Sequence, residues 1–417
     1  MKKIHPRMPK NGSVSVPGSK SLTHRVLIAA GLADGVSRVE NALFSDDSRL
    51  TMNALSEMGV LIGQEKNTLT IKGRNGRPGA AGQALWLGNS GTSMRLLAGV
   101  AALGRGTYRL TGSQRMQERP IQDLLGALNQ LGVTAVSLNG NGCPPIEIKG
   151  GDTAGGPVSV DGSLSSQFIS ALMLMAPCTE KGLEISVTGD LVSRPYVDLT
   201  VDVMTQFGIT LRRNGYRHFS IKGNQTYRPG VHRVEADCSQ AGYFWAAAAI
   251  TGSRLLVKHV SPDSRQGDLN FVRVLEQMGC RSETSDDGVS VTGGDLRAIR
   301  VDMSAMPDVV PTLAVVAAFA EGTTVIENVA HLRDKESDRL AAVATELSKM
   351  GVVARVTADG LNITGGMPKG ADIDTYDDHR IAMSFALLGL RVPGVAIRNE
   401  KCVAKSFPGF WDVFEAL

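Results

Sequence analysis

A chain of 417 residues and 44.2 kDa is too long for one ordinary hydrophobic core, so we expect two or three domains. Its 44 Lys and Arg residues nearly balance its 41 Asp and Glu residues, and only 5% of residues are aromatic, which disfavours a nucleic-acid-binding protein. No apolar run reaches the ~18–20 residues needed to cross a bilayer, and no hydrophobic segment follows the charged start at residues 1–7, which argues against a secretory signal. The five cysteines are far apart and form no C-x-x-C pair, which favours reduced residues of a cytoplasmic protein over a disulfide framework or a zinc site.

One short pattern recurs along the chain: a helical segment that ends in apolar-x-x-apolar-Gly-apolar. Its glycines are spaced by 73, 76, 71 and 72 residues, at Gly59, Gly132, Gly208, Gly279 and Gly351. We expect each copy to be a helix, a glycine just past its end, and then a strand such as 68–71 or 218–221. The final helix, 411–417, fits a sixth copy that is cut off before its glycine. This period is too long for a solenoid unit and predicts a small βαβ-containing module repeated six times, three in each of two domains.

The most charged stretch is residues 331–340, where seven of ten residues are ionisable. It runs into an apolar pattern at helical spacing, which predicts an amphipathic helix with a charged entrance. At helical pitch, Lys335 and Arg339 lie one turn apart on the same face, with Glu336 beside them. Two cations around a carboxylate at a helix N-terminus can hold an anion and move a proton beside it. The alternative is a solvated helix start with salt bridges between neighbouring turns.

Two further segments favour anion binding near the N-terminus of the chain. Residues 17–25 form a turn of small residues that leads into a helix carrying Lys20, Ser21 and Arg25 in its first turns. This segment lacks the glycines of a Walker A loop, which disfavours a nucleotide triphosphatase. Residues 87–95 are rich in glycine, so that backbone N–H groups can approach a ligand, and we expect Thr92 or Ser93 to cap the next helix.

The remaining polar segments stand at the starts of expected helices. Hydroxyl and amide side chains at such places often only cap a helix, but they also bind phosphates and polyols. An acid before an apolar helix is either a cap or a group whose pKa is tuned by burial. These segments are Arg119-Pro120, with proline at the expected first helical position, residues 163–168, residues 193–196, residues 306–312 with Asp308, residues 376–380 before the helix 381–390, and residues 401–408 with Lys405.

Taken together, the segments resemble the 5-enolpyruvylshikimate-3-phosphate (EPSP) synthase family over essentially the whole chain. Nine motifs occur in the family's order: PGSKS-x-x-x-R, GN-x-GT-x-x-R, ERP, SSQF, SRPY, MPD, DKESDRL, DDHR and CVAKSFP. The resemblance implies an α/β (α+β) protein with the two-domain enolpyruvyl transferase fold, six βαβαββ-type modules and three modules per domain. One domain is then expected at 18–234 and the other at 1–17 plus 235–417, with the active site in the cleft between them.

The reaction that the resemblance implies joins phosphoenolpyruvate (PEP) to the 5-hydroxyl of shikimate 3-phosphate and releases phosphate, on the shikimate pathway to chorismate and the aromatic amino acids. It passes through a tetrahedral intermediate and needs no metal and no organic cofactor. By position, Glu336 is the expected proton donor to PEP and Asp308 the expected base towards the hydroxyl. Lys20 is expected to bridge both substrates and to share the proton transfers.

The same resemblance assigns binding residues to each substrate. Residues expected to bind shikimate 3-phosphate are Lys20, Ser21, Arg25, Ser165, Ser166, Gln167, Ser193, Tyr196, Asp308, His331 and Lys335. Residues expected to bind PEP are Lys20, Asn89, Gly91, Arg119, Gln167, Arg339, His379, Arg380 and Lys405. Arginine suits the carboxylate and phosphate of PEP because its planar guanidinium can bind them through two parallel hydrogen bonds.

Two positions depart from the family pattern. Leu96 stands where many members have proline, in the helix linked to sensitivity towards glyphosate, a herbicide that competes with PEP. Gly91 keeps the small residue associated with glyphosate access, so we expect inhibition at the PEP site. His331 stands where some relatives carry Asn. A monomer in the cytoplasm is the family expectation.

Two other functions are weighed against this one. The related enzyme that adds enolpyruvyl to UDP-N-acetylglucosamine usually carries a reactive cysteine in a loop before an arginine, where this chain has Gln117, Glu118 and Arg119. A non-catalytic phosphate-ligand-binding protein on the same scaffold would not need to keep Asp308 and Glu336 together with lysines near both ends of the chain.

Overall fold

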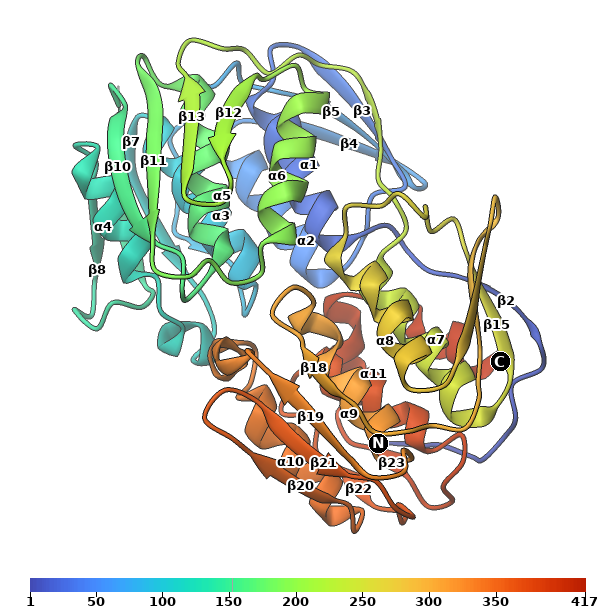
Figure 1. Ribbon diagram of the computed structural model, residues 1–417. Coiled ribbons are helices and arrows are strands. Elements are labelled where there is room, and N and C mark those ends of the chain that lie inside the picture. The colour runs from blue at the N-terminus through green and yellow to red at the C-terminus, as the bar shows by residue number, and fades with distance from the viewer. Residues whose placement is uncertain (152) are drawn as a thin grey trace. The chain divides into compact units, whose positions relative to one another are not determined.

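The computed structural model describes residues 1–151 and 153–417 (Figure 1). The chain divides into two compact units, and each has its own hydrophobic core. Unit 2 is the continuous segment Lys20–Val234, and unit 1 combines Met1–Ser19 with Glu235–Leu417. Across the described residues, no helix is long and apolar enough to span a membrane.

The described residues of unit 2 form three four-stranded sheets and six helices. In each sheet one edge strand is parallel to its neighbour, and the other two pairings are antiparallel. The sheets, in strand order, are β14 (Val231–Arg233), β3 (Val36–Glu40), β5 (Thr68–Lys72), β4 (Leu61–Glu65); β6 (Leu85–Trp86), β7 (Gly106–Thr111), β9 (Ile146–Gly150), β8 (Thr134–Ser137); and β10 (Gly156–Asp161), β11 (Gly182–Thr188), β13 (His218–Lys222), β12 (Leu211–Asn214). The helices are α1 (Lys20–Leu32), α2 (Asp46–Glu57), α3 (Gly91–Leu103), α4 (Gln122–Gln130), α5 (Ser166–Met175) and α6 (Pro195–Gln206), with 3-10 turns η1 (Arg115–Glu118) and η2 (Ala176–Cys178).

Unit 1 repeats this plan with two four-stranded sheets and one three-stranded sheet. The sheets, in strand order, are β16 (Arg281–Ser285), β17 (Gly288–Thr292), β15 (Arg254–Lys258), β2 (Gly12–Ser15); β18 (Arg300–Asp302), β19 (Thr323–Glu327), β21 (Leu361–Thr364), β20 (Val353–Val356); and β1 (Lys2–Lys3), β23 (Ala396–Ile397), β22 (Asp372–Ile373). The helices are α7 (Cys238–Thr251), α8 (Phe271–Gln277), α9 (Val310–Ala317), α10 (Arg339–Lys349), α11 (His379–Leu388) and α12 (Phe410–Glu415). The 3-10 turns are η3 (Gly267–Asn270), η4 (Pro307–Val309), η5 (Ala330–Asp334) and η6 (Glu400–Lys405).

The helices of each unit fall into two kinds. α1, α3 and α5 of unit 2 and α7, α9 and α11 of unit 1 are buried on nearly every side. Their sequences are mostly apolar beyond the polar residues near their starts. The alternate helices, such as α2 and α10, bury one face and expose the other. α3 and α5 approach closely, because a Cβ added at Gly99 would lie 2.7 Å from the Ala171 carbonyl oxygen. The polar residues at the starts of the buried helices are thereby held by a packed core.

The predicted repeat is confirmed at each of its glycines. Gly59, Gly132, Gly208, Gly279 and Gly351 directly follow the ends of α2, α4, α6, α8 and α10, and all have positive φ, between 78° and 111°. A left-handed residue at this place ends a helix and turns the chain into the next strand at low cost only when it is glycine. The six-module fold with three modules per unit, predicted from these spacings and from the resemblance, is therefore present. All five cysteines are free.

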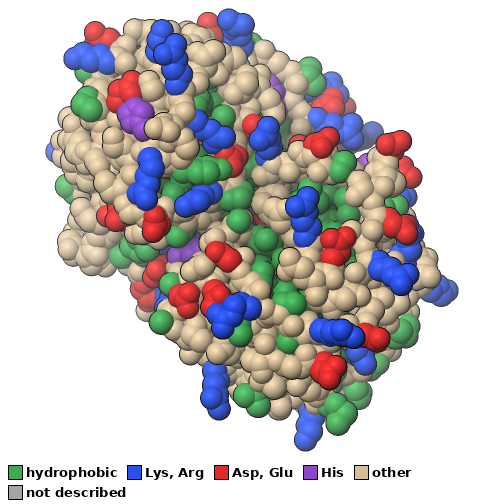
Figure 2. Space-filling model, in the orientation of Figure 1, with side chains coloured by type: hydrophobic (Ala, Val, Ile, Leu, Met, Phe, Trp, Pro, Cys, Tyr) green, Lys and Arg blue, Asp and Glu red, His purple; other side chains and the backbone are tan. Residues whose placement is uncertain are grey.

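Charge on the surface is mixed. On the face drawn in Figure 2, basic and acidic side chains are interspersed over both units. A mixed surface is also what the near balance of basic and acidic residues in the sequence leads us to expect. The concentrations of positive charge described next are local and largely buried.

Candidate active site

A buried ion-pair cluster in unit 1 is centred on Arg339, the first residue of α10. Its guanidinium donates through Nε to Asp378 Oδ2 at 2.9 Å, through Nη1 to Asp308 Oδ1 at 3.0 Å and through Nη2 to Glu336 Oε2 at 2.8 Å. Arg339, Glu336 and Asp378 are buried, and Asp308 is partly exposed. Charged hydrogen bonds in three directions hold the guanidinium in one orientation.

Asp308 is bound by a second arginine. Arg380 Nη2 donates to Asp308 Oδ2 at 2.8 Å, and Arg380 Nη1 donates to the Tyr243 hydroxyl at 3.3 Å. Each carboxylate oxygen of Asp308 therefore accepts a hydrogen bond from a different arginine. Because a buried charge is costly unless it is paired, this arrangement lets a carboxylate and two cations occupy the same small volume.

Two aspartates place these groups by capping the helices that carry them. Asp378 Oδ1 accepts from the backbone N–H of Arg380 at 2.9 Å at the start of α11, and its Oδ2 accepts from the Ser337 hydroxyl at 3.0 Å. Asp338 caps α10 by accepting from the backbone N–H of Ala341 at 3.0 Å. Aspartate is a preferred N-cap because its carboxylate satisfies free backbone N–H groups and complements the positive end of the helix.

The helix start at Arg339 corrects the prediction for residues 331–340. η5 covers Ala330–Asp334, Lys335 has an extended backbone, and Lys335 and Glu336 precede α10. The placement of Lys335 and Arg339 one turn apart on a single helix face is therefore wrong. Glu336 nevertheless contacts Arg339, because the bend between η5 and α10 brings its carboxylate back to the helix start.

Burial and neighbouring charge shift the protonation of several groups around this cluster. Burial alone would lower the pKa of Arg339, but Asp378, Glu336 and Asp308 raise it above its ordinary value. Burial and the nearby Lys335 ammonium lower the pKa of His331 to about 3, against a smaller opposing effect of Asp308. His331 is therefore neutral near pH 7 and can donate or accept a hydrogen bond without carrying charge.

A further carboxyl group, Asp268 in η3, lies in the electrostatic field of this cluster. Burial, together with the charge of Asp308, raises the pKa of Asp268 to about 8, while Arg380 opposes the shift. Burial also raises the pKa of the Tyr243 hydroxyl to about 12, so it stays protonated beside Arg380. Near pH 7, Asp268 and Tyr243 therefore hold their protons, while the carboxylate of Asp308 is paired with Arg380.

Two other residues of unit 1 that are predicted to bind PEP, His379 and Lys405, lie at the ends of helical elements. His379 is fully buried as the first residue of α11, with Nδ1 3.7 Å from Asp378 Oδ1. Lys405 is buried at the end of η6. The next residue, Ser406, accepts a hydrogen bond at its hydroxyl from Gln240 Nε2 of α7 at 3.2 Å.

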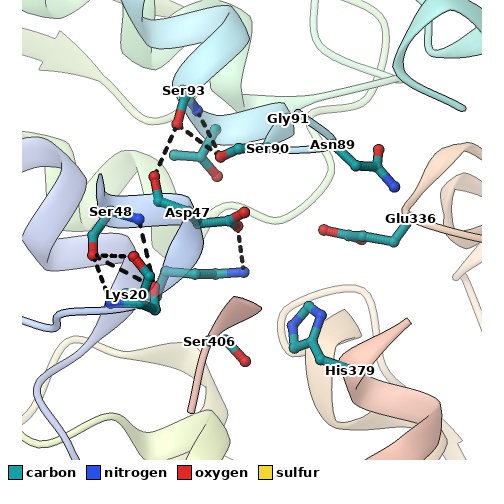
Figure 3. A network of polar contacts seen from close by, with 12 residues as sticks. Lys20, Asp47, Ser48, Asn89, Ser90, Gly91, Ser93, Glu336, His379 and Ser406 are labelled. Carbon is teal, nitrogen blue, oxygen red and sulfur yellow. Dashed lines mark hydrogen bonds and ion pairs between the residues drawn. The ribbon is translucent and has the colours of Figure 1, made fainter. Parts of the chain in front are cut away.

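A second cluster, in unit 2, surrounds Lys20, the first residue of α1 (Figure 3). Lys20 Nζ lies 3.3 Å from Asp47 Oδ2 in the first turn of α2, and both side chains are buried. The Ser93 hydroxyl in the first turn of α3 donates to the Asp47 carbonyl at 3.4 Å. Thr51 joins the same helices through a hydroxyl contact of 2.8 Å with Ser93. The starts of α1, α2 and α3 are thus brought together, and their positive ends add to the charge of Lys20.

Arg25 joins α1 to α5 and α6. Its Nε donates to Thr200 Oγ1 at 2.8 Å, and Nη2 donates to the Tyr196 carbonyl at 3.0 Å and to Ser170 Oγ at 3.2 Å. Burial lowers the pKa of Arg25 to about 10, so it remains a cation at neutral pH. Its predicted role towards shikimate 3-phosphate stays a prediction, and these contacts show how it fixes Tyr196.

Gly91 lies between two arginines at the start of α3. A Cβ added there would lie 2.5 Å from Arg119 Nη2 and 2.6 Å from Arg95 Nη1, so a side chain would displace both guanidinium groups. Arg119 donates through Nη1 to the Asn89 carbonyl at 2.9 Å, and Arg95 donates to Gln167 Oε1 at 3.3 Å. The cap of α3 is Ser90, and not Thr92 or Ser93 as predicted.

The hydroxyl residues predicted for shikimate 3-phosphate lie at the starts of α5 and α6. Ser165 caps α5 by accepting from the backbone N–H of Gln167 at 3.3 Å, and Ser166 begins that helix. Ser193 is buried with a positive φ of 54° just before α6. Pro120 does not begin a helix as predicted, because α4 begins at Gln122.

Two acidic partners were missed by the sequence analysis. Asp378 was part of a recognised motif but was given no role, although its position before a buried helix marks it as a cap. Asp47 stands 27 residues from Lys20, and nothing in the spacing indicated that they pair. In the described parts of the chain, no group of three or more His, Cys, Asp or Glu side chains is arranged to hold a metal ion.

The two clusters have the groups needed for acid–base chemistry on an anionic substrate. Carboxyl groups lie beside fixed cations in unit 1, and a lysine lies among helix N-termini in unit 2. Comparison with known proteins identifies the scaffold. The sequence pattern of EPSP synthase (3-phosphoshikimate 1-carboxyvinyltransferase) matches residues 4–414. The chain belongs to the EPSP synthase family.

Individual EPSP synthase relatives are similar along their whole length. A 3-phosphoshikimate 1-carboxyvinyltransferase of Syntrophobacter fumaroxidans is 45% identical over 100% of this chain and 99% of its own. The enzyme of that name from Sulfurovum sp. is 45% identical over 97% of this chain and 96% of its own. A solved EPSP synthase structure from Acinetobacter baumannii superposes with a TM-score of 0.81 at 30% identity, covering 99% of this chain and 97% of that one. The EPSP synthase fold therefore accounts for both units described above.

Proposed function

We propose that this EPSP synthase family member transfers the enolpyruvyl group of PEP to the 5-hydroxyl of shikimate 3-phosphate and releases phosphate. The observation that carries the proposal is the cluster of Asp308, Glu336, Arg339 and Arg380, two carboxyl groups beside two fixed guanidinium groups. It occurs in a chain whose full-length relatives are named for this transferase.

The proposed chemistry has two steps. In the first, the methylene carbon of PEP takes a proton while the 5-hydroxyl oxygen bonds to the neighbouring carbon and gives its own proton to a base, which forms a tetrahedral intermediate. In the second, the bond from that carbon to the phosphate oxygen breaks and the new methyl group loses a proton, which restores the double bond. Glu336 would supply the first proton, Asp308 would accept the hydroxyl proton, and Lys20 would share these transfers.

The anionic groups of both substrates require cations that are already in place. Arg339 and Arg380 would bind the carboxylate or phosphate of PEP, together with Arg119 and Lys405. Their orientation by carboxylates before substrate arrives would lower the cost of ordering them on binding. Lys20 would contact both substrates. The other residues that the proposal assigns to the substrates are Ser21, Arg25, Asn89, Gly91, Ser165, Ser166, Gln167, Ser193, Tyr196, His331, Lys335 and His379.

The finer family properties are also part of the proposal. We expect glyphosate to compete with PEP, and the lack of a side chain at Gly91 beside Arg119 and Arg95 supports access to that site. Leu96 is buried in α3, the helix that begins at Gly91. We further propose a cytoplasmic monomer.

The proposal is tested by measuring phosphate release from purified protein with PEP and shikimate 3-phosphate, and with each substrate omitted in turn. Release should require both. Glu336→Gln should reduce kcat by about 10²–10⁴-fold, the usual contribution of a general acid. The far-ultraviolet circular dichroism spectrum should stay unchanged, which would show that the variant is folded. Glu283→Gln is the matched control, since Glu283 is an exposed residue of β16 that pairs with Arg254.

Three results would contradict the proposal. Release with UDP-N-acetylglucosamine in place of shikimate 3-phosphate would move the chain to the related transferase. Binding of both substrates without release would indicate a non-catalytic protein. Equal activity of Glu336→Gln and Glu283→Gln would remove Glu336 from the chemistry.

A further inference from the structure

The arginine–carboxylate cluster depends on a short segment, Asp374–Asp378, that has no regular secondary structure. Tyr376 and Asp377 are consecutive residues with φ of 54° and 55°. This left-handed region is unfavourable for residues with side chains, so it persists only where surrounding contacts fix the backbone. The segment ends at Asp378, which orients Arg339 and caps the helix that carries Arg380.

Two residues of α10 bind the Asp374–Asp378 segment. Arg339, at the start of the helix, binds Asp378. Glu346, seven residues later and therefore about two turns along the same face, accepts from the Tyr376 hydroxyl at 2.6 Å and from the backbone N–H of Asp374 at 3.1 Å. The two contacts hold both ends of the segment against one rigid helix.

Glu346 is well suited to this role. Its side chain is fully buried, and its two oxygens accept from Lys349 Nζ at 2.9 Å as well as from Tyr376 and Asp374. The Tyr376 residue is 43% exposed, yet its hydroxyl reaches this buried carboxylate. The next residue, Asp377, accepts from Asn399 Nδ2 at its Oδ1 at 2.9 Å. The side chains of both strained residues are thus hydrogen-bonded to neighbouring elements.

We propose that Glu346 and Tyr376 are positioning residues for the active site: they clamp the Asp374–Asp378 segment to α10 and so hold Asp378 where it orients Arg339 and the start of α11. Neither residue belongs to the set expected to touch substrate. They act through Asp378 on the two arginines that bind Asp308. This role rests on the proposed function, because Arg339 and Arg380 are proposed there to bind PEP.

The test uses Tyr376→Phe in the full chain, which removes only the hydroxyl that Glu346 accepts. Amide hydrogen exchange of peptides covering residues 374–380 should become faster, since the backbone N–H groups of Asp378 and Arg380 are hydrogen-bonded within this segment. The Michaelis constant for PEP should rise about tenfold while kcat changes less than about threefold, because ground-state and transition-state binding by the arginines are lost together. A residue that only stabilised the fold would change neither constant.

Tyr108→Phe is the matched control, because it also removes one tyrosine hydroxyl, which donates to the Gly79 carbonyl at 2.8 Å in unit 2. It should leave the exchange of residues 374–380 and the Michaelis constant for PEP unchanged. Glu346→Gln serves as a second variant, with an effect in the same direction as Tyr376→Phe, and thermal unfolding shows whether each variant is folded.

Two outcomes would overturn the positioning role. Unchanged exchange at residues 374–380 in both variants would show that the clamp does not order the segment. Faster exchange with an unchanged Michaelis constant for PEP would show that the segment does not position the arginines. Absence of phosphate release in the unmodified protein is a separate result: it contradicts the proposed function, and the exchange data then decide whether the clamp exists.

Discussion

Replacing Arg339 by methionine tests how strongly the cluster in unit 1 depends on its central cation. Methionine is similar in length and apolar, so it fills much of the space but removes the guanidinium. The buried carboxylates of Glu336 and Asp378 both accept hydrogen bonds from this guanidinium, and without it Asp308 would keep only Arg380. The variant therefore leaves buried negative charge without its partner.

The expected loss of stability is large. Removing one partner of a buried charge network costs about 3–5 kcal/mol. For a unit of this size, each kcal/mol shifts the midpoint of thermal unfolding by about 2–4 °C, so we expect a decrease of about 10 °C near pH 7.

The loss should also depend on pH in one direction. In the unmodified protein the pKa of Arg339 is raised, so its contribution is present throughout the range between about pH 5 and pH 8. In the variant, the orphaned carboxyl groups should bind protons above about pH 4, where the unfolded chain has released them. The folded variant then holds more protons than the unfolded one, and its stability falls as pH rises, by up to about 1.4 kcal/mol per pH unit for each proton.

The measurement is the unfolding midpoint of the unmodified protein and the variant at several values between about pH 5 and pH 8. Arg25→Met is the control, because Arg25 is equally buried but donates to hydroxyl and carbonyl oxygens, which do not titrate here. Its loss of stability should be the same at each pH. If the loss in Arg339→Met is also independent of pH, the reasoning from buried carboxylates is refuted.

Three further substitutions follow from the same contacts. Gly91→Ala places a methyl group 2.5 Å from Arg119 Nη2. In phosphate-release assays, the Michaelis constant for PEP and the inhibition constant for glyphosate should each rise about tenfold. Unchanged constants would show that the guanidinium moves aside without consequence. The pKa of His331 is lowered to about 3, so the folded protein loses stability as pH falls below about 6.5. In denaturant titrations, His331→Asn should reduce the dependence of the unfolding free energy on pH by up to about 1.4 kcal/mol per pH unit. The pKa of Asp268 is raised to about 8, so the folded protein loses stability as pH rises from about 4 to 8, and Asp268→Asn should flatten that decline; a parallel curve would mean that Asp268 ionises normally.

Much of the architecture could be predicted from the sequence because its signals are local. A glycine after a helix must adopt positive φ for the chain to turn, and this requirement acts at Gly59 or Gly351 whatever surrounds them. The repeated spacing of such glycines is enough to count the modules. The motifs that resemble the EPSP synthase family likewise indicated Asp308, Glu336 and Arg339, which the structure brings together.

Two helix starts were predicted wrongly, because more than one residue near each start could act as the cap. The prediction set Lys335, Glu336 and Arg339 at helical pitch, but the Asp338 side chain caps the helix, so Lys335 and Glu336 precede it. The same competition makes Ser90 the cap of α3, in place of Thr92 or Ser93. Several polar residues in a row offer several possible caps, and the packing of the helix decides among them.

By itself, the sequence determined the modules and the residue types available for acid–base chemistry. Only the tertiary structure decided which charges meet. The pairs Lys20–Asp47 and Arg339–Asp378 join residues that lie 27 and 39 positions apart. Removing these charges from water is costly, and their mutual attraction in the buried interior offsets that cost only when the pair is brought into contact. This contact depends on the packing of whole helices, which no spacing along the chain encodes.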